Sequence, residues 1–179
     1  MTVTRPAIRS GARALGVLAL GCLAARAATA AEAYAMNSVV LLQPEAVVGA
    51  RVSSVQDLAA YVQGLNGAAA KALAGRAAAA SAGNIAVAVR PGGKAKIWLD
   101  FTPALDPDLQ RSLQAALDAV TPVTVQEGLV LFAINASLWG APQVTRLPQP
   151  PEWLRAMQPG STESLEQMVD RIWPARIGN

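Results

Sequence analysis

The chain has 179 residues, with no histidine, a single cysteine and a formal net charge of +3. It therefore has almost none of the two side chains, histidine and cysteine, that proteins use most for catalysis near neutral pH and for binding transition metals, and we expect no metal or other cofactor. Because no cluster of lysine and arginine marks one face, we expect no nucleic-acid partner.

The first thirty residues have the pattern of an export signal. The basic start consists of Arg5, Arg9 and Arg13. An apolar run over residues 14–25 follows, and the small residues 28–30 suit a signal peptidase. Because a membrane-spanning helix needs roughly 20 residues, we expect residues 1–30 to be a cleaved signal. The mature protein is then periplasmic or secreted, without a membrane span.

The cysteine offers an alternative location. Residues 18–22 resemble a bacterial lipoprotein box, in which the chain is cut before a cysteine that becomes lipidated. The protein would then be anchored through Cys22. Arg26 and the small residues 28–30 favour ordinary secretion over this alternative.

Residues 31–179 are expected to form a single domain. Cleavage at residue 30 removes four of the fifteen basic residues, so eleven remain against twelve acidic ones and the net charge becomes −1. It also removes the only cysteine, which excludes a disulfide within the mature chain. The core must therefore hold by apolar packing, in agreement with a hydrophobic content of 53%.

The first half of the mature chain predicts a strand and a helix. Residues 38–42 are a short apolar run closed by Pro44, which is typical of a strand. Apolar residues at helical spacing behind the polar residues 53–57 predict a helix from about Val55. We expect this helix to break near residues 66–67, because glycine is a poor helix former. The alanine-rich segment 68–83 is then either further helix or a linker.

Residues 85–101 predict a β-hairpin with one apolar face. Apolar residues occupy alternate positions on both sides of the turn at residues 91–93. Proline suits the first corner of such a turn and glycine the second. The outward face carries a possible interaction surface, made of Trp98, Lys94, Lys96 and Asp100. Either a C-terminal helix covers this face, or Trp98 marks a contact site for a partner.

A capped helix and a central strand follow the hairpin. Asp106, Pro107 and Asp108 are typical of a helix start, which we favour over a calcium site. Residues 129–138 are almost unbroken in apolar side chains, as in a strand covered on both faces. Asn135 begins a glycosylation sequence in this strand, but its place predicts a buried or edge polar group with a backbone partner instead.

The C-terminal part predicts a proline-rich strap, residues 142–151, that leads to two short helices. The apolar stripe of the last helix is formed by Leu165, Met168, Val169, Ile172 and Trp173. The whole chain therefore predicts an α+β fold, with a small and mostly antiparallel sheet under packed helices. The sheet would contain the hairpin 85–101 and the central strand 129–138.

Two functions fit these residues. The first is an exported, non-catalytic domain that binds another cell-envelope protein, which the absence of histidine and of a mature cysteine favours. The alternative is a hydrolase that acts on cell-wall polymer through carboxylates alone, since glycoside hydrolysis needs only two acids about 5 to 10 Å apart. The sequence predicts no oligomeric state.

Overall fold

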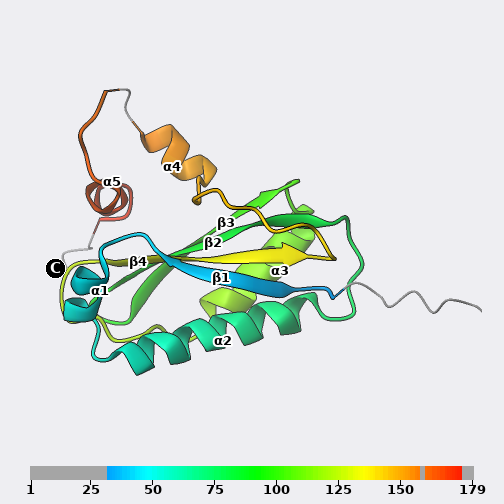
Figure 1. Cartoon of the computed structure of the whole chain (residues 1–179), viewed down its shortest axis with the longest axis horizontal. Coiled ribbons are helices and arrows are strands. Elements are labelled where there is room, and N and C mark those ends of the chain that lie inside the picture. The colour runs from blue at the N-terminus through cyan, green and yellow to red at the C-terminus, as the bar shows by residue number, and fades with distance from the viewer. Residues whose placement is uncertain (1–31, 158–159, 175–179) are drawn as a thin grey trace, which may run out of the picture. The chain divides into compact units, whose positions relative to one another are not determined.

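The computed structural model describes residues 32–157 and 160–174, and the expected signal segment with Cys22 lies outside them. The sheet has the strand order β1-β4-β2-β3, and all its pairings are antiparallel (Figure 1). Its strands are β1 (Ala35–Leu41), β2 (Ser81–Arg90), β3 (Lys94–Thr102) and β4 (Val130–Leu138). The described helices are α1 (Glu45–Arg51), α2 (Val55–Leu73), α3 (Pro107–Asp118), α4 (Pro151–Ala156) and α5 (Leu165–Ile172). The predicted α+β class is confirmed, including the hairpin and the central strand.

The sheet is built from two interlocked halves. The first half is β1, α2 and β2, and the second is β3, α3 and β4. β4 lies between the two strands of the first half, and β2 lies between the two strands of the second. Neither half can therefore form its part of the sheet without the other.

The two faces of the sheet bury different cores, as the alternation along β2 shows. Ile85, Val87 and Val89 pack in the core that α2 and α3 cover. Ala86 and Ala88 point the other way, into a smaller core with residues of α4 and α5. The result is a three-layer arrangement, with helices on both faces of the sheet (Figure 1).

The central position of β4 explains its continuous apolar sequence. Every residue of this strand is buried, because it has a neighbouring strand on each side and helices on each face. The hairpin turn has positive φ angles of 82° at Gly92 and 67° at Gly93. These are left-handed conformations that glycine adopts without strain.

The expected break in α2 is wrong. The helix continues through residues 66–67 to Leu73, and residues 74–80 form an irregular connection to β2. Leu65, Ala69 and Leu73 are fully buried under the sheet. Their burial outweighs the cost of the glycines, because tertiary packing routinely overrides helix propensity.

Other element boundaries follow local capping. Asp106 accepts a hydrogen bond from the backbone N–H of Asp108 at 2.9 Å, which confirms the predicted start of α3. α1 was not predicted, because a helix of seven residues shows too little periodicity to be recognised. Within the described parts of the chain, no helix is both long and apolar enough to cross a bilayer.

Substituting Gly83 should destabilise the sheet. A Cβ atom at this position would lie 2.0 Å from the backbone oxygen of Asp100 and 2.7 Å from Cα of Phe101. Since these are backbone atoms of β3, the strands would have to separate. We expect Gly83→Ala to lower the free energy of unfolding by about 3 kcal/mol, measured by urea denaturation.

Gly67→Ala is the matched control for this substitution. Gly67 lies within α2, and a Cβ there would meet nothing within 4 Å. Because alanine is the better helix former, this variant should be more stable by up to about 1 kcal/mol. Equal effects of the two substitutions would contradict the close approach at Gly83.

Both tyrosines of the chain should ionise at a higher pH than a tyrosine exposed to water. Burial raises the pKa of Tyr34 to about 12, and burial together with the charge of Asp118 raises that of Tyr61 to about 12. The unfolded chain ionises near 10, so this contribution to stability is present below pH 10 and is lost as the pH rises through about 12. Phenolate absorbance should therefore rise near pH 10 only in denaturant, and a rise near pH 10 in the folded protein would contradict this burial.

Candidate functional site

The C-terminal segment covers the predicted interaction surface of the hairpin. Trp98 is only 6% exposed, because Trp153 of α4 packs edge-on against it with 5.2 Å between ring centroids. The carboxylate of Glu152 accepts hydrogen bonds from the indole of Trp98 and from Lys96, the latter at 2.7 Å. Of the two alternatives for this face, coverage by a C-terminal helix or exposure as a contact site, the structure shows coverage by a helix.

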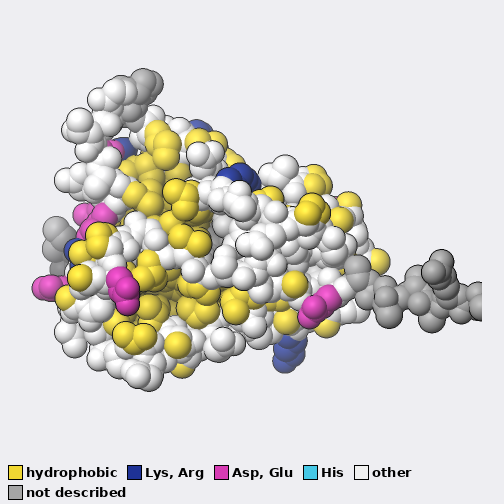
Figure 2. Space-filling model, viewed as in Figure 1, with side chains coloured by type: hydrophobic (Ala, Val, Ile, Leu, Met, Phe, Trp, Pro, Cys, Tyr) yellow, Lys and Arg dark blue, Asp and Glu magenta, His cyan; other side chains and the backbone are white. Residues whose placement is uncertain are grey.

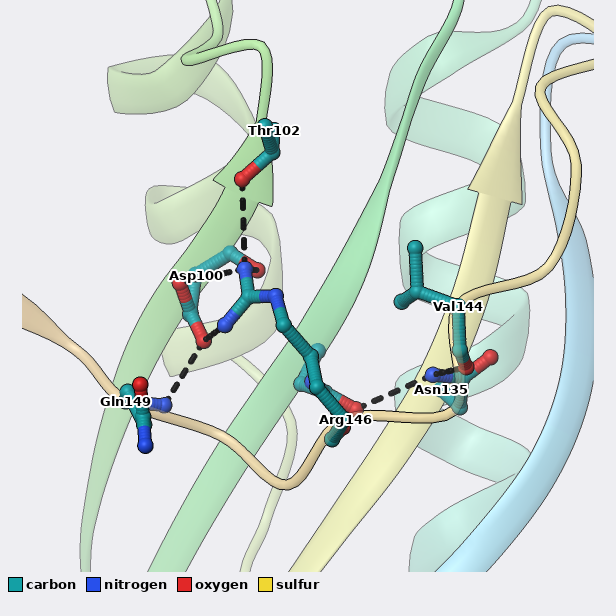
Figure 3. A network of polar contacts seen from close by, with 7 residues as sticks. Asp100, Thr102, Asn135, Val144, Arg146 and Gln149 are labelled. Atoms are coloured by element: carbon teal, nitrogen blue, oxygen red, sulfur yellow. Dashed lines mark hydrogen bonds and ion pairs between the residues drawn. The ribbon is translucent and has the colours of Figure 1, made fainter.

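Asp100 is bound by the proline-rich strap. Arg146 donates to both carboxylate oxygens, at 2.6 and 2.9 Å, and the backbone N–H of Gln149 donates to one of them at 2.7 Å (Figure 3). The hydrogen bond to Asp100 raises the pKa of Arg146, against the smaller effect of burial. Of the four residues predicted for this surface, only Lys94 is exposed.

A row of polar side chains crosses the sheet beneath the strap. The amide of Asn135 donates to the side-chain oxygen of Asn84 at 3.1 Å and to the backbone oxygen of Val144 at 2.9 Å. The amide of Asn37 donates to Asn135 at 3.1 Å, and that of Asn84 donates to the backbone oxygen of Arg146 at 3.2 Å. The predicted backbone partner of Asn135 is confirmed, and this polar row fastens the strap to the sheet.

Arg90 holds the last helix in a similar way. Its side chain is nearly buried, and its guanidinium lies 4.2 Å from the ring centroid of Trp173. It also donates to Asp170 at 3.1 Å and to the backbone oxygen of Trp173. Together with the buried Met168 and Val169, these contacts dock the predicted apolar stripe of the last helix on the sheet.

Several clefts of the described chain have acidic residues in their lining. One, of about 900 Å³, lies beside the hairpin turn and has Asp118 as its single acidic residue. A second cleft, of about 630 Å³, is lined by both Glu166 and Asp170. Arg51 binds Glu166 at 2.7 Å and Arg90 binds Asp170, so arginines already occupy both carboxylates. Residues 32–157 and 160–174 hold no group of three or more acidic, histidine or cysteine side chains that could bind a metal ion.

The two edges of the sheet differ in protection. At the β3 edge, Gln114 of α3 donates to the backbone oxygen of Ile97 at 3.3 Å, and Glu152 pairs with Lys96. Lysines and a covering segment are common means of protecting an edge strand. The centre of β3 is accordingly buried.

The β1 edge has no such protection in the described part of the chain. β1 pairs with β4 on one side only, and no charged residue occurs between Glu32 and Glu45. Its centre is exposed, with Val39 40% accessible. Figure 2 shows hydrophobic side chains gathered over β1 and the adjoining part of α1, with few charged side chains among them.

No protein-family model, curated protein or solved structure matches the chain. The function therefore has to be argued from the geometry of this molecule.

Sequence reasoning missed the open edge. The partner of β1 is β4, which follows it by almost a hundred residues, so no local pattern shows which side of β1 is paired. The signal that was available is the stretch of residues 33–43, which contains neither a charged residue nor a proline, because edge strands usually carry one of these.

The contact between Glu152 and the hairpin should make the stability of the fold depend on pH in the acid range. Burial alone would raise the pKa of Glu152, but hydrogen bonds from Lys96 and Trp98, with the charges of Lys96 and Arg155, lower it below 4.5. A lowered pKa stabilises the fold above the ordinary value, and this contribution is lost as the pH falls through the lowered value.

The difference in melting temperature between the wild type and Glu152→Gln should therefore be constant above pH 4.5 and shrink below it. Glu127→Gln, at an exposed position in the turn before β4, controls for the loss of one negative charge. A difference that stays constant down to pH 2 would contradict the prediction.

Proposed function

We propose that this protein is an exported, non-catalytic domain of the cell envelope that binds another protein. The N-terminal segment has the features of a cleaved signal, which supports a periplasmic or secreted location. The observation that carries the binding function is the contrast between the two sheet edges. Side chains of α3 and α4 cover the edge of β3. The edge of β1 is open to solvent, and the strand carries no charged side chain.

The internal pairing of the charged groups supports a non-catalytic role. A glycosidase needs one carboxyl group as an acid and a second as a base or nucleophile. In the cleft that has two carboxylates, Arg51 and Arg90 bind them and at the same time dock α5. These four side chains are thus used to hold the C-terminal helix on the sheet.

The outer face of the sheet is a poorer candidate for the partner than the edge. A partner on that face would have to displace Trp153, which is 1% exposed, and break the bidentate pair between Asp100 and Arg146. A partner that pairs with β1 would break no such contact, because β1 has no neighbouring strand on its outer side in the described chain.

The test is to express the full chain in a bacterium and isolate it from the envelope fraction with its bound proteins. Each candidate partner is then purified separately and titrated against the chain by calorimetry. We expect one partner to bind with a defined stoichiometry and a Kd of about 1 μM or tighter. The intact mass should correspond to a start at Ala31 without an acyl group.

The control for catalysis uses the same preparation. The chain is incubated with purified cell-wall polymer, and released sugar ends are measured for the wild type and for Glu166→Gln. Release that this substitution abolishes, without any protein partner, would replace the proposal with the hydrolase alternative. A cytoplasmic protein with its N-terminal segment intact would contradict the proposed location.

A further inference from the structure

The open edge of β1 has a defined set of free backbone groups. The N–H of Leu42 donates to the oxygen of Leu131 at 3.0 Å, so the backbone of Leu42 points toward β4. Backbone groups alternate in direction along a strand, and those of Leu41 and Val39 therefore point away from β4. The described chain has no strand on that side of β1.

We propose that β1 binds an extended, uncharged segment of another envelope protein, which adds to the sheet as a fifth strand. This inference rests on the proposed function and names its binding surface and the chemistry of the partner. The hydrogen bonds would come from the N–H and C=O groups of Val39 and Leu41. Strand addition to an exposed sheet edge is an established way to recognise extended peptides.

The side chains along β1 determine which residues the added strand should carry. Asn37 lies on the strap-covered face, where it bonds to Asn135 and Ser137, so small polar residues of the partner suit that face. Val39 lies opposite Ile134 on the face of the sheet that α2 covers, and it is partly exposed there. Apolar β-branched residues of the partner therefore suit that face. No charge on residues 33–44 would compensate a charged residue of the partner.

An irregularity in β1 favours a partner segment over a second copy of this chain. The register with β4 shifts between Met36 and Ser38, so Asn37 has no partner residue in β4. Two copies of β1 paired around a twofold axis would each present this bulge, which limits regular pairing to the few residues after it. A separate extended segment can follow the bulge, because its own register is not fixed by symmetry.

The experiment selects random nine-residue peptides displayed on phage against the purified full chain. The probe is then the selected peptide in synthetic form, with its Kd measured by calorimetry. We expect uncharged peptides with alternating polar and β-branched residues. N-methylation of one alternating set of amides should weaken binding by about tenfold or more, because it removes the two hydrogen bonds donated to the C=O groups of Val39 and Leu41. Methylation of the other set should have little effect.

Val39→Pro is the decisive variant. Proline is tolerated at an edge position whose N–H points outward, so the sheet should persist. The added strand would lose the N–H of residue 39 as a hydrogen-bond donor and would clash with the proline ring. Val39→Lys, which adds a charge at the same point, is the second variant. Both should fold, as shown by their melting temperatures, and both should lose peptide binding by about tenfold or more.

Ala95→Pro is the matched control on the other edge. The outward position of the oxygen of Ile97 places the N–H of Ala95 on the same outer side of β3, so this variant changes the protected edge only. It should bind the peptides as the wild type does. Peptides that bind Val39→Pro and the wild type equally would overturn the proposal.

A second copy as the occupant would give a different result. Sedimentation would then show a dimer of the wild type that Val39→Pro converts to a monomer, and this outcome would also overturn the proposal. If the envelope partner binds while Val39→Pro leaves its Kd unchanged, the proposed function stands and only the assignment of its surface fails.

Discussion

The pairing of β4 with both β1 and β2 is the constraint on which the rest of the structure depends. β4 joins two halves of the chain that each lack a central strand, and its residues are buried along their whole length. Phe132 and Ile134 belong to the core under α2 and α3, while Leu131 belongs to the core under α4 and α5. One strand therefore contributes side chains to both cores.

Small residues on the outer face let a short C-terminal segment serve as a third layer. Ala86 and Ala88 leave room above β2, and the indole of Trp153 fills it beside Trp98. Helices of six and eight residues are too short to be stable alone. Ion pairs to Lys96, Arg90 and Arg51 help to hold them on the sheet, together with the buried side chains of Trp153, Met168 and Val169.

Local patterns predicted the parts of the fold that depend on local physics. The Pro91 turn with alternating residues on both sides specifies the hairpin, and Asp106 specifies the start of α3, because each acts within a few residues. The length of α2 could not be predicted in the same way. It depends on burial of Leu73 beneath a sheet whose strands lie elsewhere in the sequence.

The candidate site was predictable only in part for the same reason. Alternation placed Trp98, Lys96 and Asp100 on the outward face of the hairpin. Which segment lies above them depends on Arg146 and Glu152, which follow by about fifty residues and reach back across the sheet. The sequence shows a proline-rich strap, but the direction in which such a strap leaves the sheet is a property of the folded chain.

That direction explains why one edge is protected and the other open. After β4 the strap crosses the sheet in order: Val144 accepts from Asn135 of β4, Arg146 accepts from Asn84 of β2, and Gln149 then donates to Asp100 of β3. Each step moves it toward β3 and away from β1. Because the strap starts at the strand next to β1 and runs the other way, it covers the outer face toward β3 and leaves the edge of β1 without a neighbouring strand in the described chain.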